Sequence, residues 1–476
     1  MTTRRAFIAG CGAAATAAAC SRGHAPTGND ISQLEPTALA GIARVDGQRS
    51  LVDALQRHRG LVCVAGGRFS MGGQTSAEGA LQLDMTGCNR LLRLDVPGKV
   101  ARVQAGMRWR ELQALLDPHD LSVKVMQSFS SFTVGGSVGV NCHGRYVGNG
   151  SLAATIRALQ VVLRSGEVVE TSRSQRPDLF AAVIGGYGLL AVVTEVELDL
   201  ADNARMARHM QRVALADYPQ WFADHVQSRD DALMHNADLL PPRFDVPVTV
   251  TWRRSDAALT DTLRLVPVGD RYAYEQNMIW AVSELPGGAQ LRDSSLVQKQ
   301  LQQPRVIHRN LEASLDVASL EPRTRAMSTY LLQEYFIPVQ QFQAFATRMA
   351  AILQQHRVDA LNVSIRHAPA DTTSLLAWAR QAVFCFVLYH KQRRFPWSDT
   401  LATGWTRALI DAALDCGGSY YLPYRPHATR DQFRRAYPQW EGFAETKRQY
   451  DPQMQLVNHL WQRYIAAPSA SGRTSP

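Results

Sequence analysis

The sequence predicts an α+β protein with more than one domain, and three observations lead to this prediction. A chain of 476 residues is long enough for two domains and a large hydrophobic core. Between residues 42 and 200, short apolar runs typical of strands are interspersed with stretches that have helical spacing. Past Asn203 the composition changes, and residues 204–420 again mix helical and strand patterns. We therefore expect one α+β domain followed by another.

The overall composition is that of an ordinary globular protein. Hydrophobic residues make up 46% and charged residues 20% of the chain. The formal net charge is +9, but the basic residues are scattered, which indicates solubility rather than a nucleic-acid-binding surface. Of seven cysteines, five follow the first 20 residues, and they lie far apart without metal-ligand spacing. We expect neither a disulfide framework nor a metal site.

The first 20 residues have the form of a bacterial twin-arginine export signal. Arg4 and Arg5 precede a weakly apolar, alanine-rich run that ends at Cys20. This signal predicts an exported, periplasmic protein. Cys20 is a candidate lipid-attachment site that would tether the protein to a membrane, and the alternative is a plain cleavage site with an incidental cysteine. Residues 21–36 are polar, contain Gly and Pro, and are interpreted as a linker.

The first predicted strand leads into a glycine-rich loop. Residues 61–64 form a short apolar run of the buried-strand type, and residues 65–74 follow directly with four glycines. The loop lacks the Lys-Ser/Thr pair of a nucleotide P-loop and the spacing of the dinucleotide fingerprint, so a long turn is the alternative. Residues 81–85 and 101–106 then predict short strands, and residues 109–116 predict a helix.

A second glycine-rich stretch, residues 128–144, is the feature around which this half of the chain is organised. It contains Gly135, Gly136, Gly139 and Gly144, separated by small or hydroxylic residues. Glycines let the backbone approach a ligand closely, and clustered amides can bind an anion such as a pyrophosphate. One such stretch is equally well explained as a turn, but two within one region favour a binding site.

The remaining elements follow in order. Residues 159–163 and 167–170 flank a turn and predict a β-hairpin, residues 178–180 open a short helix, and residues 189–200 predict a long strand after the Gly-Gly-Tyr-Gly run at 185–188. In the second half, residues 246–252 predict a strand and residues 339–356 an amphipathic helix. Residues 332–338, 362–367 and 384–390 are strand-like runs.

This order of motifs resembles the flavin domain of the vanillyl-alcohol oxidase superfamily. The residues that carry the resemblance lie at 64–72, 83–85, 103–106, 133–136, 141–144 and 185–188. Within the superfamily, the chain is most similar to the aldonolactone and sugar-alcohol oxidases and to the decaprenylphosphoryl-ribose oxidase branch. The resemblance implies a two-part FAD-binding domain of the PCMH type, with an inserted α+β substrate domain (cap). Its expected segments are an FAD-binding part at 37–203, a cap at 204–420, a C-terminal segment at 421–466 that returns to the FAD-binding part, and a disordered tail at 467–476.

The resemblance also implies which residues bind FAD. Those expected at the cofactor are Ala65, Gly66, Gly67, Arg68, Phe69, Ser70, Met71, Gly72, Ser128, Thr133, Val134, Gly135, Gly136, Asn141, His143, Gly144, Val192 and Tyr421. Many sugar oxidases of this family attach FAD covalently to a histidine in the first loop. No histidine lies between Arg68 and Gly106, so we predict noncovalent FAD. Cys142 is a second candidate point for covalent FAD attachment, and the alternative is that it is only a small packing residue.

Three residues are expected to act on the substrate. Glu334 is a lone acid in an apolar run, for which a salt bridge is the structural alternative. Arg366 lies in a strand where aldonolactone oxidases carry a Glu-x-Arg pair, but Ser364 replaces the acid here. Tyr424 stands where the decaprenylphosphoryl-ribose branch has a lysine, which argues against that substrate. A base role for Tyr424 would need a cationic neighbour such as Arg425 or Arg366, and structural packing is the alternative.

The resemblance implies an exported FAD-dependent oxidoreductase acting on a CH–OH carbon of a sugar, polyol or lactone, with hydride transfer to flavin N5. Oxygen, a quinone or a carrier protein could take the electrons. One alternative is the same fold acting on a phenolic or amine substrate. Another is an FAD-binding scaffold protein without turnover, favoured by the missing acid beside Arg366 and the missing attachment histidine. No motif indicates a nucleic-acid partner.

Overall fold

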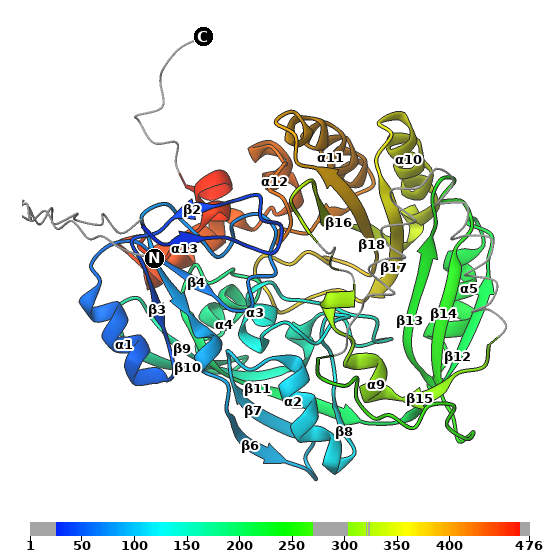
Figure 1. Cartoon of the computed structure of the whole chain (residues 1–476), viewed down its shortest axis with the longest axis horizontal. Coiled ribbons are helices and arrows are strands. Elements are labelled where there is room, and N and C mark those ends of the chain that lie inside the picture. Colours follow the sequence, from blue (N-terminus) through cyan, green and yellow to red (C-terminus); the bar gives the residue numbers. More distant parts are fainter. Residues whose placement is uncertain (1–24, 270–302, 320, 322–323, 467–476) are drawn as a thin grey trace, which may run out of the picture.

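The computed structural model describes residues 25–269, 303–319, 321 and 324–466. The predicted signal peptide, including Cys20, and the predicted tail lie outside the described residues. Residues 41–202 form two sheets (Figure 1). The smaller is parallel, with the order β3-β5-β4 and helix α1 beside it. The elements are β3 (Gly41–Arg44), α1 (Gln48–Arg57), β4 (Val62–Ala65) and β5 (Leu81–Asp84).

The second sheet is antiparallel and has the order β10-β9-β11-β7-β6, with β8 pairing the far end of β11. Its strands are β6 (Leu91–Asp95), β7 (Val100–Gln104), β8 (Leu121–Val123), β9 (Ile156–Val162), β10 (Val168–Ser172) and β11 (Val192–Asp202). The helices of this region are α2 (Trp109–Leu116), α3 (Val134–Gly139) and α4 (Pro177–Val183). Helix α2 has the predicted bounds, because Trp109, Leu112 and Leu116 recur at helical spacing and are all fully buried.

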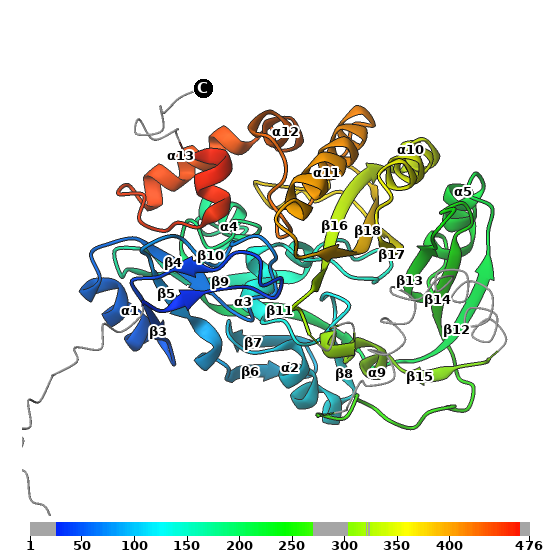
Figure 2. The same ribbon diagram turned by 45° about the horizontal axis from the view of Figure 1, so that its top comes forward.

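The second half of the chain forms an eight-stranded antiparallel sheet with the order β15-β12-β14-β13-β17-β18-β16-β19. Its strands are β12 (Arg205–Arg212), β13 (Ala232–Leu239), β14 (Val248–Arg254), β15 (Val306–His308), β16 (Ser328–Pro338), β17 (Ala360–Ala368), β18 (Val383–Arg393) and β19 (Ser419–Tyr420). Helices α10 (Phe342–Gln355) and α11 (Ser398–Asp415) lie side by side on one face of β16 and β18 (Figures 1 and 2), and α5 (Tyr218–Phe222) lies near β13 and β14.

One segment of the predicted cap packs on the first domain instead. Helix α9 (Arg309–Ala313) lies against β8 and the end of α2 (Figure 2). The Asn310 side chain donates to Asp117 Oδ1 and to the backbone oxygen of Leu121, both at 2.9 Å. The Arg309 guanidinium donates to the backbone oxygen of Val123. This segment therefore ties the eight-stranded sheet to the first domain.

The C-terminal segment returns to the first domain through α12 (Arg430–Ala436) and α13 (Trp440–Tyr450). After α13 the chain runs alongside β4: the Val62 amide donates to the Gln455 oxygen, and the Val457 amide donates to the Val62 oxygen, both at 2.8 Å. The smaller sheet is thus extended by residues almost 400 positions away. In Figure 2, the red C-terminal helices lie above the blue N-terminal strands.

The structure corrects the prediction that residues 21–36 form a linker, for the part of this range that it describes. Residues 25–36 pack on the glycine-rich loop and include β1 (Thr27–Gly28), which pairs with β2 (Thr37–Ala38). Asp30 is buried and accepts from the Gly73 amide at 3.1 Å, and the Ile31 amide donates to the Arg68 oxygen at 3.0 Å. A polar composition misled the prediction, because these polar groups bond to the loop rather than to water. Among the described residues, no helix has both the length and the apolar character needed to span a bilayer.

Candidate active site

Two adjoining cavities lie where the two halves of the molecule meet. The larger, about 730 Å³, lies between the glycine-rich segments and the eight-stranded sheet, and the smaller, about 90 Å³, runs towards the turn after α4. Residues that line both are Gly66, Ser70, Thr75, Thr133, Gly136 and Val140. The two glycine-rich stretches predicted from the sequence therefore share one site.

The stretch at residues 128–144 is not a simple loop. Thr133 caps the six-residue helix α3, and its Oγ1 accepts from the Gly136 amide at 3.3 Å. The opposing loop approaches closely, because a Cβ built on Gly66 would lie 2.3 Å from Thr133 Oγ1. A Cβ on Gly135 would lie 2.6 Å from that of Ala105. Glycine is needed at these positions to bring two backbones and a ligand together.

Most of the predicted cofactor residues line the cavities. They are Gly66, Gly67, Arg68, Phe69, Ser70, Met71, Ser128, Thr133, Gly135, Gly136, His143 and Tyr421. Six do not line either cavity, namely Ala65, Gly72, Val134, Asn141, Gly144 and Val192.

The register of β11 explains one of these corrections. Val192 points into the core, where it is fully buried, and Val193 lines the smaller cavity, because side chains alternate along a strand. Asn141 has a structural role instead: its side-chain nitrogen donates to Asp371 Oδ2 at 2.7 Å, and its oxygen accepts from the Ala153 amide at 3.0 Å.

The prediction missed part of the smaller cavity. Its wall includes residues 186–191, Gln74 and Thr75. The Gly-Gly-Tyr-Gly run at 185–188 was a usable signal, since Gly185 and Gly188 have φ values of +73° and +71° and so make a turn that favours glycine. Gln74 gave no local signal, because its role depends on the C-terminal segment. Its side-chain nitrogen donates to the Leu422 and Tyr424 oxygens.

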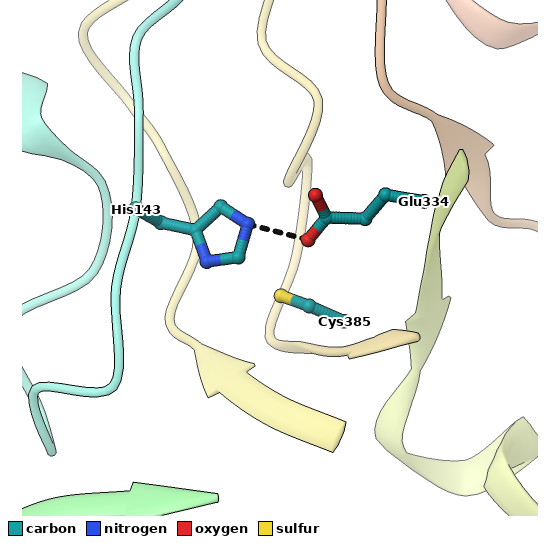
Figure 3. Close-up of side chains that lie close together, drawn as sticks. All are labelled: His143, Glu334 and Cys385. Atoms are coloured by element: carbon teal, nitrogen blue, oxygen red, sulfur yellow. Dashed lines mark hydrogen bonds and ion pairs between the residues drawn. The ribbon is translucent and has the colours of Figure 1, made fainter. Parts of the chain in front are cut away.

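Glu334, His143 and Tyr424 meet at the inner end of the larger cavity. His143 Nε2 lies 2.5 Å from Glu334 Oε1, and the Tyr424 hydroxyl donates to Glu334 Oε2 at 3.4 Å (the His143–Glu334 contact is dashed in Figure 3). The Glu334 and His143 side chains are only 2% and 3% exposed. The two come from different halves of the chain, and the Tyr421 amide, which donates to the Glu334 oxygen, joins the C-terminal segment to them.

Burial determines the protonation state of Tyr424. It raises the pKa of the phenol well above its ordinary value, and Glu334 adds to this effect, whereas Arg366 opposes it. Arg425, the other cation considered, is bound to Glu35 and Asp399. Tyr424 therefore remains a hydrogen-bond donor at neutral pH. The geometry does not support its role as a base, and the acid–base capacity of the site lies in Glu334 and His143.

Arg366 reaches the same cavity from β17. Directly opposed residues put their side chains on the same face of a sheet. Glu334 (β16) is opposite Val387 (β18), which is opposite Ser364 (β17). Two positions along the strands, Cys385 (β18) is opposite Arg366 (β17). Ser364, Arg366, Val387 and Glu334 all line the larger cavity. The three residues predicted to act on the substrate are thus brought to one site.

Cys385 lies beside the pair, and its Sγ, His143 and Glu334 each place a ligand-type atom within 4.8 Å of the others (Figure 3). Metal binding would require the thiolate. Burial raises the pKa of the Cys385 thiol well above its ordinary value, with Glu334 adding to the effect, so the thiol is protonated. We interpret Cys385 as a neutral packing residue beneath the His143–Glu334 pair.

The cavities fit a flavin dinucleotide. Gly66 and Gly136 line both cavities without side chains, which leaves room for phosphates, and buried polar atoms at the walls lack protein partners among the described residues. These atoms are Thr75 Oγ1, Ser128 Oγ and His143 Nδ1. Buried polar groups are almost always hydrogen-bonded, so these atoms indicate that the site accommodates a polar ligand.

We expect the substitution Gly136→Trp to abolish FAD binding. Gly136 lines both cavities, and even a Cβ there would lie 2.8 Å from Thr133 Oγ1. Gly442→Trp is the matched control, because Gly442 is exposed, lines neither cavity, and a Cβ there has no neighbour within 4 Å. The flavin absorbance per protein molecule in the two purified variants measures the effect. A Gly136→Trp protein as yellow as the parent would contradict the assignment.

Comparison with known proteins agrees with this site. The profile of the family described as FAD binding domain matches residues 36–172, and that of the family described as D-arabinono-1,4-lactone oxidase matches residues 276–464. L-gulono-1,4-lactone dehydrogenase of Mycobacterium tuberculosis is 25% identical over 398 residues, which cover 81% of this chain and 86% of that protein. Alditol oxidase of a Streptomyces species is 32% identical over 117 residues, covering 25% of this chain and 28% of that protein. Decaprenylphosphoryl-beta-D-ribose oxidase of Mycolicibacterium smegmatis is 31% identical over 144 residues, covering 30% and 31%.

The fold and the site define an FAD-dependent oxidoreductase with a PCMH-type FAD-binding domain. The matched domains and the relatives, which include aldonolactone oxidases and an alditol oxidase, are those of the vanillyl-alcohol oxidase superfamily.

Proposed function

We propose that this enzyme oxidises a CH–OH carbon of a sugar, polyol or lactone. The observation that carries the proposal is the buried Glu334–His143 pair, with Tyr424 donating to it, at the inner end of a large cavity beside the FAD-binding segments. The names of the relatives, which refer to sugar lactones and alditols, support the same substrate class.

The protein groups have separable roles in this reaction. FAD, when bound, supplies a two-electron acceptor for the hydride. Gly66, Thr133 and Gly136 would hold its phosphates, and Ser128 and Tyr421 line the rest of the cavity. The Glu334–His143 pair takes the substrate hydroxyl proton as the carbonyl forms, and Tyr424 orients the carboxylate by its hydrogen bond. The buried position of the pair keeps bulk water away from this transfer.

An absorption spectrum tests this proposal. Purified protein, without oxygen, is mixed with a panel of polyols, sugar acids and sugar lactones, and flavin bleaching is followed. Bleaching by a panel member supports the proposal. Bleaching only by a phenol or an amine would show that the enzyme acts on those substrates instead, and a flavin that no compound bleaches would favour a scaffold protein.

In the same preparation, acid should release all the flavin from the precipitated protein, because we predict that FAD is bound noncovalently. Flavin that stays with the precipitate would show covalent attachment.

We also propose that the protein is exported through the twin-arginine route and tethered through Cys20. The support is the sequence of residues 1–20, which lie outside the described structure. Replacing Arg4 and Arg5 with lysine should keep the protein in the cytoplasm, as cell fractionation would show. Unchanged export would contradict the export proposal, and the absence of a lipid label on Cys20 would contradict only the proposed tether.

For the reaction itself, oxygen, a quinone or a carrier protein would accept the electrons from the reduced flavin.

A further inference from the structure

Arg366 is unusual among the arginines of the larger cavity because it has no acidic partner among the residues that the structure describes. Arg68 pairs with Asp84 at 3.1 Å, Arg145 with Glu312 at 2.6 Å and Arg325 with Glu321 at 2.5 Å. In the described part of the chain, no carboxylate lies within 4.0 Å of the Arg366 guanidinium, and its buried Nε has no hydrogen-bond partner.

The groups around Arg366 on the sheet are polar but do not neutralise it. Ser364 and Asn362 share its face of β17 and line the cavity, as does Asn236 of β13. Asp238 is opposite Ser364, but it accepts from the side chains of Asn236 and Asn362, at 3.4 and 3.3 Å. A partly buried guanidinium without a counter-charge is costly, so this arrangement is suited to a ligand that supplies one.

The chemistry of the guanidinium identifies that ligand. Arginine offers a planar fork of N–H donors that matches a carboxylate in two parallel hydrogen bonds. Neutral hydroxyls bind it less strongly, because they bring no negative charge to offset that of the guanidinium. Serine at position 364 means that β17 itself brings no acid to the site.

The distance to the reacting groups suits a sugar acid. Arg366 and Glu334 lie on strands separated by one other strand, β18. Neighbouring strands are about 4.8 Å apart, and the two residues are also offset by two positions, or about 7 Å, along the strands, so their backbones are about 12 Å apart, with both side chains on the same face of the sheet. A hydroxylated chain of a few carbons can therefore place one end at Arg366 and a CH–OH carbon at the Glu334–Tyr424 contact.

We propose that the substrate is an anionic sugar derivative, an aldonate or a uronate, whose carboxylate is bound by Arg366. This inference rests on the proposed function and names its substrate class. In the reaction, the C–H bond of the oxidised carbon would break, and bound FAD would supply the acceptor for its electron pair and hydrogen. The hydroxyl proton goes to the Glu334–His143 pair, and the carboxylate on Arg366 is unchanged.

The first experiment compares matched substrates on the FAD-loaded protein without oxygen. D-gluconate, L-gulonate and D-galacturonate are each tested beside a neutral counterpart: the alditol, the 1,4-lactone or the methyl ester. We expect one acid to bleach the flavin about 100-fold faster than its neutral counterpart, in keeping with the loss on breaking a buried charge pair. Arg366→Gln should remove this preference, and Arg366→Lys should retain part of it.

A second experiment measures binding without turnover. Glutarate carries carboxylates but no hydroxyl, and glutaramide is its neutral counterpart. We expect glutarate, and not glutaramide, to perturb the flavin spectrum, with affinity reduced about 100-fold in Arg366→Gln. Ser364→Glu should also weaken glutarate binding, because it supplies the missing acid, whereas Ser364→Thr, the matched control, should not.

The outcomes separate the two proposals. A neutral polyol or lactone that bleaches the flavin as fast as its acid would overturn the anionic-substrate inference and support the proposed function. If no compound bleaches the flavin but glutarate binds through Arg366, the anion site is supported and the proposed function is wrong. Glutarate binding that is unchanged in Arg366→Gln would overturn the assignment of Arg366.

Discussion

Replacing Lys447 with methionine is expected to lower the free energy of unfolding by about 3–5 kcal/mol and to weaken FAD retention. The Lys447 side chain is fully buried, and its Nζ donates to Asp451 Oδ2 and the Leu189 oxygen at 2.7 Å and to the Leu456 oxygen at 2.8 Å. Burial lowers the pKa of Lys447, and Asp451 opposes this effect. Without the ammonium group, the Asp451 carboxylate, which is only 1% exposed, would remain buried without its counter-charge.

The effect should extend to the cofactor because Leu189 belongs to the turn that lines the smaller cavity. Urea unfolding with flavin fluorescence and circular dichroism measures both losses. Arg348→Met is the matched control: it removes the Arg348–Asp415 pair, whose side chains are about half exposed, and should cost less than about 1 kcal/mol. The double variant Lys447→Met with Asp451→Leu should recover part of the loss. An unchanged unfolding midpoint in Lys447→Met would contradict the structural role of this pair.

Replacing Glu334 with glutamine should slow substrate-dependent flavin reduction by about 100- to 10,000-fold, the usual contribution of a positioned acid–base group. Glutamine has nearly the same shape but cannot take the hydroxyl proton. The backbone contact of Glu334 with the Tyr421 amide does not depend on the side chain, so FAD binding should persist. Anaerobic stopped-flow measurement of the rate of flavin reduction, in the parent and in the variant, tests this prediction.

Two further variants help to interpret this result. Tyr424→Phe should give a smaller loss, because it removes the hydrogen bond to Glu334 and leaves the proton acceptor in place. Glu312→Gln is the matched control: Glu312 is also buried and bound to a cation, Arg145, but it does not contact Tyr424. Its flavin should be reduced at close to the parent rate. Equal losses in Glu312→Gln and Glu334→Gln would indicate a general structural effect, and the assignment of Glu334 would be wrong.

Local patterns in the sequence predicted what local physics determines. The spacing of Trp109, Leu112 and Leu116 placed α2, and the two glycine-rich stretches indicated where the backbone approaches a ligand. Sequence patterns predicted the site less well where the role of a residue depends on partners that are distant in the chain. His143 and Glu334 are 191 positions apart, and no pattern in the sequence indicated that they contact each other.

The corrections also have physical causes. Val192 was named instead of Val193, because a strand pattern does not establish which of two adjacent apolar residues faces a ligand. The packing of residues 25–36 on the glycine-rich loop was missed for a related reason. Asp30 bonds to the Gly73 amide, and no local pattern reveals such a contact between distant segments.

The return of the C-terminal segment to β4 determines when during synthesis the cofactor site can be completed. Val62 bonds to residues 455 and 457, and the Gln74 side chain is held by the oxygens of Leu422 and Tyr424. A nascent chain of only the first 200 residues therefore lacks the C-terminal residues that complete the FAD-binding site. These contacts of very long range make closure of the site a late step in folding. Stable cofactor capture thus has to wait until translation is nearly finished, and it then reports that the whole chain has folded.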